Sequence, residues 1–298
     1  MQLQHRPSTS NPLHDRLFAG LQDEPLTFLT SSAGLVRLID RASRDDCTIE
    51  DAVKLVHNEP LVAAKMVAMA NSAAYKRPND DGAVTSVKVA LGLLGLDMLK
   101  AVAGAVMVGQ LTAKAANVNG PTVARLWAHS IEVAALAAVI SRSFTKDPPE
   151  TALFTGIVHE IAGFYILSKS TELVDLTGGN MVAAVAQDAA RQEEASASVM
   201  AVGTRRLLAA LKVPDEVSQA IEGQWRGYLK LPPETLGDTL MVANLMATTP
   251  NPFDPPGLAG SGNLDLEEVL NQSEVTAVIR EAYDQVRAIQ QAFNPRPA

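Results

Sequence analysis

Cysteine is almost absent from this 298-residue chain. Its one cysteine, Cys47, excludes an intramolecular disulfide and a zinc site built from several thiolates. Cys47 follows Asp45 and Asp46, and neighbouring carboxylates disfavour a thiolate. We therefore interpret Cys47 as an incidental or structural thiol in a protein of a reduced compartment.

Aromatic residues are also scarce: they make up 4% of a chain that is 47% hydrophobic. Alanine, valine and leucine must therefore fill most of the core. Runs such as residues 133–139 favour helix, because alanine loses no side-chain entropy there. Aromatic and β-branched strand signals are rare. The composition predicts an all-α protein, and the length allows one large domain or two moderate ones.

Basic residues are outnumbered, and the formal net charge is −8. This balance argues against a broad nucleic-acid surface, which needs excess lysine and arginine to neutralise phosphates. The first residues contain no apolar stretch typical of a signal peptide, and no uninterrupted apolar run reaches about 18 residues. We therefore expect a cytoplasmic protein without a membrane partner, and nucleic acid is not an expected partner.

Several nucleotide and hydrolase signatures are missing as well. The chain has no Walker-type phosphate loop, no paired-glycine dinucleotide fingerprint and no Gly-x-Ser-x-Gly elbow. We expect no cofactor.

Breaker residues divide the chain into four parts. Residues 1–15 are polar and predict a flexible tail, and residues 16–248 predict a helical domain with a break near 117–121. Residues 249–263 are rich in proline and glycine, which predicts a surface loop. Residues 264–298 predict a C-terminal helix and tail.

Two local patterns make predictions at the level of single residues. Thr48, Ile49, Glu50 and Asp51 resemble a capping box at the start of a helix. The helix that follows Pro60 places the apolar residues Leu61, Ala64, Ala68 and Met69, with the stem of Lys65, on or near one stripe.

Four segments, taken in order, resemble the HDOD family, a branch of the HD phosphohydrolase superfamily. The first resembles an acid-Pro-Leu … Ala-Asn-Ser helix, and the second a Ser-Ile … Leu-Gly segment. The third and fourth carry the histidines of Leu-Trp-Ala-His-Ser and Gly-Ile-Val-His-Glu. The segments are residues 58–75, 85–95, 126–130 and 156–163, and the resemblance covers roughly residues 24–248.

The resemblance implies a multi-helix HD-like bundle with an N-terminal helical subdomain. It also implies that four positions are structural hallmarks: Pro60, Asn71, Ser72 and Gly95. An active HD site resembles a histidine, a His-Asp pair and a distant aspartate around a metal. The corresponding residues here are His129, the pair His159-Glu160, and Asn244.

The metal ligands that this resemblance implies are incomplete. Asn244 keeps a carbonyl oxygen but loses the charge, which makes it a poor ligand for a hard cation. The chain has five histidines and none follows His159, so the family's later histidine pair would fall near Gln224 and Trp225. A two-metal centre has too few donors. We therefore predict no catalytic residue and no bound metal.

The residues themselves leave two interpretations of the histidines open. His129 shares a helical face with Leu126 and Val133, and we expect both His129 and His159 to be buried. They could be satisfied core histidines, since buried polar groups usually find partners. The alternative is a relic pocket for a small ligand, lined by His129, His159, Glu160 and Asn244, with a rim of Gln224, Trp225 and Arg226.

The resemblance implies a non-catalytic bacterial signal-transduction or regulatory output module that acts through protein–protein interaction with an unidentified signalling protein. The predicted contact regions are the helix at 264–293 and the acidic surface. Homo-oligomers remain open. Two alternatives are a residual metal-dependent HD-type phosphohydrolase, with His129, His159 and Glu160 as ligands, and a sensor of a nucleotide-like small ligand in the relic pocket.

Overall fold

The computed structural model describes most of the chain, and every regular element in the described part is a helix. This confirms the all-α prediction. The described residues are 12–13, 15–17, 33–75, 83–192, 194–226, 230–254 and 274–293.

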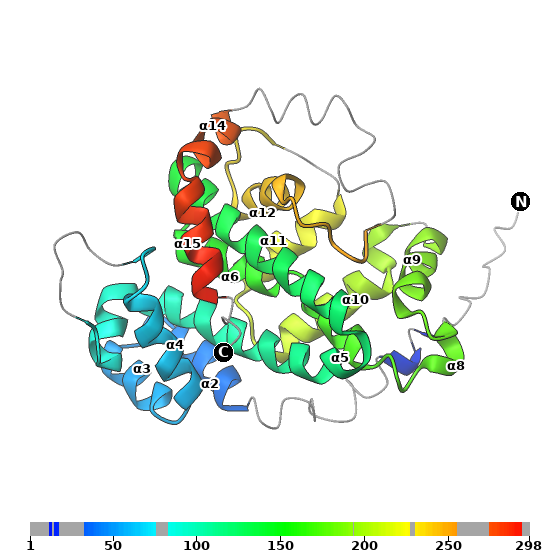
Figure 1. The fold of residues 1–298 in the computed structure, drawn as a ribbon, viewed down its shortest axis with the longest axis horizontal. Coiled ribbons are helices and arrows are strands. Elements are labelled where there is room, and N and C mark those ends of the chain that lie inside the picture. Colours follow the sequence, from blue (N-terminus) through cyan, green and yellow to red (C-terminus); the bar gives the residue numbers. More distant parts are fainter. Residues whose placement is uncertain are drawn as a thin grey trace, which may run out of the picture.

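The N-terminal helices α2 (Ala33–Ala42), α3 (Ile49–Val56) and α4 (Pro60–Ala70) form a group at one end of the molecule (Figure 1). The predicted capping box is present at α3. The Thr48 hydroxyl accepts from the Asp51 amide at 3.1 Å, and the Asp51 carboxylate accepts from the Thr48 amide at 3.3 Å. Each group satisfies a donor that the first helical turn leaves unpaired.

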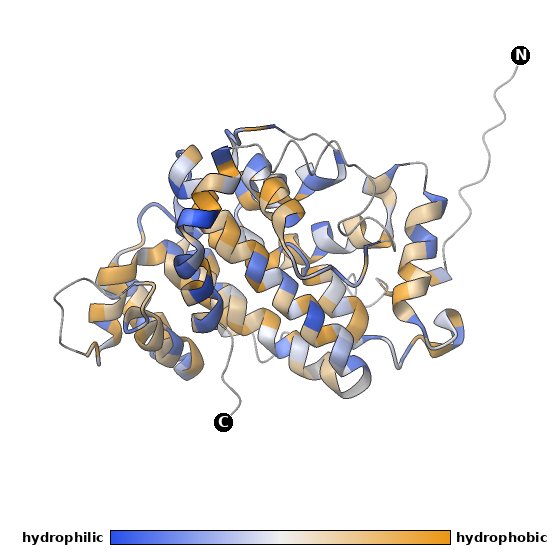
Figure 2. Cartoon of the chain, turned by 45° about the horizontal axis from the view of Figure 1, so that its top comes forward, coloured by the Kyte–Doolittle hydropathy of each residue, from blue (hydrophilic) through white to orange (hydrophobic). Residues whose placement is uncertain are grey.

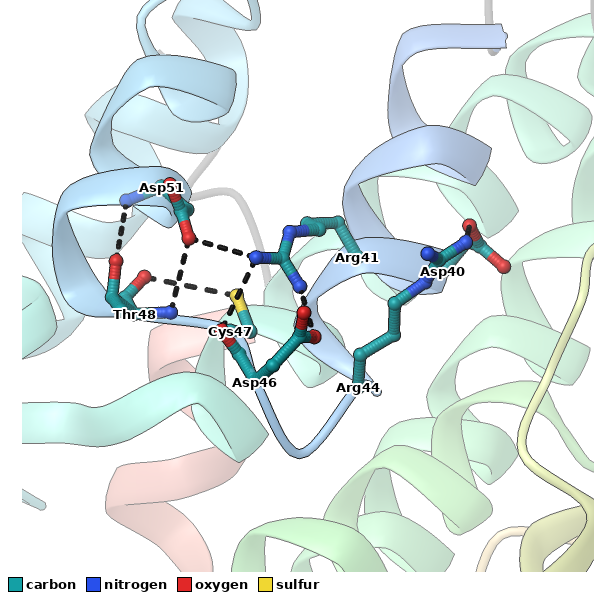
Figure 3. Close-up of polar contacts among 7 residues, drawn as sticks. All are labelled: Asp40, Arg41, Arg44, Asp46, Cys47, Thr48 and Asp51. Carbon is teal, nitrogen blue, oxygen red and sulfur yellow. Dashed lines mark hydrogen bonds and ion pairs between the residues drawn. The ribbon is translucent and has the colours of Figure 1, made fainter.

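An arginine on α2 fixes the turn that leads into α3. The Arg41 guanidinium donates to the carboxylates of Asp46 and Asp51, as Figure 3 shows. Cys47 lies inside this cluster, and burial raises the pKa of its thiol although Arg41 opposes the shift. The raised pKa favours the protonated thiol, and the interpretation of Cys47 as an incidental or structural thiol stays a prediction.

The packed face of α4 differs from the predicted stripe. Val62 and Met66 are fully buried, whereas Leu61 is 54% exposed and Ala64 and Ala68 also face solvent. Of the predicted stripe, only Met69 is buried. The helix is apolar nearly all the way round, so the spacing of its apolar residues does not select a face.

The helix α5 (Val87–Phe144) runs 58 residues along the molecule. Its backbone leaves helical geometry at Gly95 (φ 79°, ψ 177°) and at Asn119 (φ −134°, ψ 43°). The positive φ at Gly95 is a conformation that other residues rarely adopt, which explains a glycine at this hallmark position. The kink at Asn119 lies in the predicted break at 117–121.

The helices α6 (Pro149–Val158) and α7 (Ile161–Ser168) form the centre of the core against α5. Residues 151–168 are almost entirely buried, and apolar positions dominate the central helices (Figure 2). Gly156 allows α6 to touch α5, because a Cβ there would lie 2.4 Å from the Ala134 Cα. Close packing of α5 and α6 therefore depends on this glycine.

Three helical stretches are long and apolar enough to cross a membrane by length and composition: Val87–Ala113, Asn119–Phe144 and Pro149–Ser168. All three lie inside the protein, where 67%, 78% and 100% of their most apolar windows are buried. Burial in the core accounts for their apolar character.

The remaining helices pack around α5 to α7 (Figure 1). In chain order they are α8 (Val174–Thr177), α9 (Met181–Arg191), the 3₁₀ turn η2 (Ala195–Ala197), α10 (Val199–Ala210), α11 (Asp215–Gly223), the 3₁₀ turn η3 (Gln224–Arg226), α12 (Leu236–Met246), α14 (Glu274–Glu281) and α15 (Tyr283–Phe293).

The predicted C-terminal helix is two helices in the described residues, α14 and α15, and residues 264–273 lie outside the described part. Val275, Ile289 and Phe293 are buried, and both helices pack on α5. The apolar face of this predicted contact region is therefore already used within the chain.

The structure differs in part from two predicted boundaries. Among the described residues, 12–13 and 15–17 are helical and Leu13 is buried, which differs from a flexible tail at the end of the predicted range; residues 1–11 lie outside the described part. Residues 249–254 form a loop without helix or strand, and Pro250 and Asp254 are exposed, but the side chains of Asn251 and Phe253 are buried. Prolines prevent a helix there, but they do not prevent burial. Residues 255–263 lie outside the described part.

Candidate functional site

Two helices that are distant in sequence bring His129 and His159 together. His129 lies within α5, and its ring centroid is 5.5 Å from that of His159. His159 ends α6 and Glu160 precedes α7, so the short irregularity between these helices presents both side chains. Both histidines are 2% exposed, which confirms the prediction that they are buried.

The backbone fixes the tautomer of each ring. His129 Nδ1 lies 2.8 Å from the Thr249 carbonyl oxygen, and His159 Nδ1 lies 2.7 Å from the Gly156 carbonyl oxygen. A carbonyl only accepts, so each Nδ1 donates a proton and each Nε2 of the neutral ring carries a lone pair. Both Nε2 atoms are buried without a hydrogen-bond partner. The rings are therefore half-satisfied core histidines.

Glu160 extends this cluster of lone pairs. Its Oε1 accepts from the Asn251 side-chain amide at 2.9 Å, whereas its Oε2 is buried and unpartnered. Burial, together with the charge of Asp254, raises the pKa of Glu160 to about 8. Burial and the nearby His129 lower the pKa of His159 to about 3. Near pH 7 both groups are neutral, so their 3.7 Å contact is not an ion pair.

The cluster has the donors for one metal ion. One ligand atom from each of His129, His159 and Glu160 lies within 4.8 Å of the other two. Two imidazoles and a carboxylate are a ligand set that single zinc ions use. In metal sites, a histidine ligand usually donates its other ring N–H to a carbonyl or carboxylate, which fixes the ring orientation. The Nδ1 hydrogen bonds to backbone carbonyls orient both rings here in the same way. Among the described residues, no other set of three histidine, cysteine or acidic side chains lies this close together.

The segment that follows α12 packs against the cluster; we call residues 248–254 the strap. It turns at its end, where the Asp254 amide donates to the Asn251 carbonyl at 3.2 Å. Glu132 lies one helical turn after His129 on α5 and binds the first two residues of the strap. The Glu132 carboxylate accepts from the Thr248 amide (2.9 Å), the Thr248 hydroxyl (2.7 Å) and the Thr249 amide (2.9 Å). These bonds outweigh the effect of burial and lower the pKa of Glu132.

The far end of the strap is anchored by a ring. Phe253 is buried, and its amide donates to the Asn251 side-chain oxygen at 3.0 Å. A Cβ on Gly163 would lie 2.8 Å from the Phe253 ring and 3.0 Å from Leu126, so the glycine creates the notch that receives the ring. Together with the His129–Thr249 and Glu160–Asn251 bonds, these contacts place the strap across the histidine pair.

Glu132, Asn251 and Phe253 were missed by the sequence analysis. A signal existed for Glu132, because an acid in the apolar face that carries His129 needs a partner when it is buried. For Asn251 and Phe253 the surrounding prolines indicated a loop and concealed their burial.

The other predicted pocket residues have different neighbours. The Asn244 amide donates to Gln224 Oε1 at 3.1 Å, so these two predicted residues meet each other. Trp225 and Arg226 line an open surface pocket of about 450 Å³ with Arg205, and the histidine pair does not line that pocket. That Asn244 shares a ligand pocket with the histidines stays a prediction.

The hallmark residues have structural roles. Pro60 opens α4, where the missing amide hydrogen costs nothing. The Asn71 amide donates to the Val84 carbonyl at 2.7 Å, and the Asn71 side-chain oxygen accepts from the Val84 amide at 2.8 Å. Ser72 donates to the Met69 carbonyl at 2.8 Å. Asn71 thus joins the end of α4 to the segment that enters α5.

Comparisons with known proteins agree with this architecture. The family model described as the HDOD domain matches residues 30–226. No curated protein matches the chain.

Similar solved structures show the same fold. A protein from Shewanella amazonensis SB2B, provisionally named a metal-dependent phosphohydrolase, has a TM-score of 0.66 at 18% identity, over 95% of this chain and 98% of that one. An HDOD domain protein of unknown function from Geobacter sulfurreducens has a TM-score of 0.56 at 18% identity, over 87% and 90%. A provisionally named signal transduction protein from Marinobacter aquaeolei VT8 has 0.53 at 17% identity, and the match spans 98% of this chain and 62% of that one.

Proposed function

Because the chain belongs to the HDOD family, we propose that it is a regulatory signal-transduction module that acts by binding another protein and turns over no substrate. The observation that carries this proposal is the strap. The Thr249 carbonyl accepts from His129 Nδ1 and the Asn251 amide donates to Glu160 Oε1, while Glu132 and the Gly163 notch hold the strap at its two ends. A substrate would have to displace a segment with anchors at both ends.

The ligand set supports the same conclusion. A two-metal hydrolytic centre needs further donors, and no histidine follows His159 in the sequence. Asn244 stands where the resemblance implies an aspartate, and its amide is bonded to Gln224. The proposal includes a cytoplasmic location, which fits helices whose apolar character is explained by the core.

The experiment is a hydrolysis assay on a panel of phosphomonoesters, phosphodiesters and nucleotides with Mn²⁺, Mg²⁺ or Zn²⁺. We expect the wild-type protein to show no turnover above that of His159→Ala. Asn244→Asp, which restores the acid, serves as a matched gain-of-function control. Turnover by the wild type that disappears in His159→Ala would contradict the proposal.

The three unpartnered atoms favour a second candidate, which is binding of a single divalent cation. His129 Nε2, His159 Nε2 and Glu160 Oε2 would hold the ion, and the ion would supply charge to polarise an oxygen ligand. Buried polar atoms without hydrogen-bond partners are costly, and binding of an ion, with release of the Glu160 proton, would remove that cost. Elemental analysis of the purified protein tests this. A stoichiometric metal absent from His159→Ala would establish it, and a metal-free protein would exclude it.

A further inference from the structure

We propose that the surface pocket between η2, α10 and η3 is a binding site for a guanine nucleotide, with the base on Trp225 and the phosphates on Arg205 and Arg226. The inference goes beyond the proposed function and does not depend on it, because a nucleotide can bind here whether or not the chain binds another protein. The histidine pair does not line this pocket.

The pocket is a hollow of about 450 Å³ at the place where the two 3₁₀ turns meet. The turns η2 and η3 contact each other, and α10 contacts both η2 and α11. Small-molecule sites have volumes of about 300–1,000 Å³, so the hollow has the size of a ligand site. Its polar and aromatic lining residues are Glu194, Ser196, Arg205, Glu222, Trp225 and Arg226.

Two arginines in the pocket make no ion pair with any described carboxylate. Arg205 is half-buried, and its guanidinium donates to the Ser196 carbonyl at 2.7 Å. This bond holds the side chain at the pocket and leaves most of its N–H groups available. Arg226 is exposed on η3. The planar arginine fork matches the oxygens of a phosphate or a carboxylate, so the two guanidinium groups provide an anion site.

Trp225 adds an aromatic surface beside this anion site. Its side chain is half-buried: part of it packs against the hydrophobic core and part lines the pocket. Nucleobases stack on aromatic side chains of this kind. A nucleotide brings a base to the indole and phosphates to the guanidinium groups, whereas a simple carboxylate or inorganic phosphate would leave the indole unused.

Glu222 selects the base. Its carboxylate lines the pocket and has no hydrogen-bond or ion-pair partner among the described residues, whereas the Glu194 carboxylate accepts from the Ser196 hydroxyl at 3.2 Å. An unpaired carboxylate repels phosphate, but its two oxygens accept from two adjacent N–H groups. Guanine presents such a pair on its Watson–Crick edge. Adenine presents one amino group beside a ring nitrogen that only accepts.

The turn that carries Trp225 and Arg226 is held in place by α12. Gln224 opens η3, and its side-chain oxygen accepts from the Asn244 amide at 3.1 Å. Arg205 is held in the same way by the Ser196 carbonyl. The aromatic surface and one arginine are therefore positioned before a ligand arrives, which reduces the entropy lost on binding.

Isothermal titration calorimetry of the full chain tests the site, with GDP, ADP and inorganic phosphate as probes in buffer that contains EDTA. We expect GDP to bind roughly tenfold or more tightly than either ADP or phosphate, since each lacks bonds to a charged group or a ring. Arg205→Ala and Arg226→Ala should each weaken GDP binding by roughly tenfold or more. Arg125→Ala, at an exposed position of α5, is the matched control and should leave binding unchanged. Glu222→Gln should remove the preference for GDP over ADP.

Tryptophan fluorescence locates the base, because the chain has only two tryptophans. We expect GDP to quench the emission of the wild type and of Trp127→Phe, since Trp127 does not line the pocket. Quenching should be absent in Trp225→Phe. Quenching that persists in Trp225→Phe would overturn the inference.

Circular dichroism melting first confirms that each variant is folded. A variant that does not fold is replaced by its conservative counterpart: Arg205→Lys, Arg226→Lys or Trp225→Tyr. The inference is overturned if millimolar GDP does not bind, if ADP or phosphate binds as tightly as GDP, or if the arginine variants bind GDP as the wild type does. Hydrolysis of a nucleotide in the assay described above would contradict the proposed function and leave this site unaffected.

Discussion

At the scale of single residues, Asn71 shows how a hallmark position acts. Its side-chain amide pairs with both backbone groups of Val84, 13 residues along the chain, as a neighbouring strand would. The pattern Ala-Asn-Ser predicted that this residue matters but did not indicate its partner. The partner lies beyond a chain segment whose length and path are not encoded in the helix that Asn71 ends.

Asn71→Ala should therefore destabilise the protein by about 1–2 kcal/mol, the net value of one or two hydrogen bonds to backbone. Denaturant unfolding followed by circular dichroism measures the change. Asn58→Ala is a matched control, since the Asn58 amide donates to the Lys54 carbonyl only four residues away. Equal effects of the two substitutions would show that the Val84 pairing is not important.

Glu160 and His159 predict an unusual pH dependence. The folded protein keeps the Glu160 proton up to about pH 8, whereas the unfolded carboxyl releases it near 4.5. Between these values the folded state binds more protons, so stability falls as pH rises. His159, with a pKa lowered from 6.5 to about 3, has the opposite effect: its contribution is lost as pH falls below 6.5. The two slopes oppose each other between pH 4.5 and 6.5.

We expect wild-type stability to fall between pH 6.5 and 8 by up to about 1.4 kcal/mol per pH unit, the slope for one proton. Glu160→Gln imitates the protonated acid and should remove that fall. Urea unfolding at pH 5, 6.5 and 8 measures it, with Glu216→Gln, at an exposed position of α11, as a control for the loss of one carboxyl. A Glu160→Gln variant with the wild-type slope would show that Glu160 is not the group involved.

At the scale of helices, contact between α5 and α6 sets the position of both histidines. Gly156 is the point of closest approach, since its absent side chain faces the Ala134 backbone. The Gly156 carbonyl also orients the His159 ring. Packing and site geometry therefore depend on the same residue.

Gly156→Ala should force α5 and α6 apart and destabilise the protein by about 1–3 kcal/mol, the usual cost of overpacking. Gly109→Ala is the matched control, because a Cβ on Gly109 of α5 has open space and alanine favours helix. Thermal unfolding of the two variants compares them. A neutral Gly156→Ala would contradict the close approach of these helices.

The sequence predicted helix ends better than helix faces. The Thr48–Asp51 capping box depends on residues next to one another in the chain, and it is present. The α4 stripe is not the buried face, because Leu61 and Val62 are equally apolar, and only the surrounding helices decide which is buried. Neighbouring residues decide where a helix begins and ends, whereas the surrounding helices decide which of its faces is buried.

At the scale of the whole molecule, the strap connects segments of the chain that are far apart in sequence. It runs from the end of α12 to Glu132 on α5 and to Glu160 before α7, and only a run of prolines marks it in the sequence. His129, His159 and Glu160 were placed together correctly by the family resemblance. The strap that covers them could not be predicted in this way. Glu132 binds it through backbone amides, which almost any sequence carries.

Glu132→Gln should loosen the strap without changing the helices. A glutamine has one acceptor oxygen where the carboxylate has two, so at least one of the three bonds from Thr248 and Thr249 is lost. We expect destabilisation of about 1–3 kcal/mol, as for a buried bond to a charged group. Limited proteolysis should cut the strap faster in this variant, with Glu222→Gln as the control. Unchanged cleavage would contradict the role of Glu132.

The central claim, that the strap closes the histidine cluster, is tested most directly by hydrogen–deuterium exchange of the peptide that covers residues 247–254. In the wild type we expect the Thr248 and Thr249 amides to be strongly protected, since the buried Glu132 carboxylate accepts both hydrogens. The protection should be lost in Glu132→Gln while α5 to α7 stay protected. Wild-type amides that exchange at the rate of an unstructured chain would show that the site is open and would contradict the account.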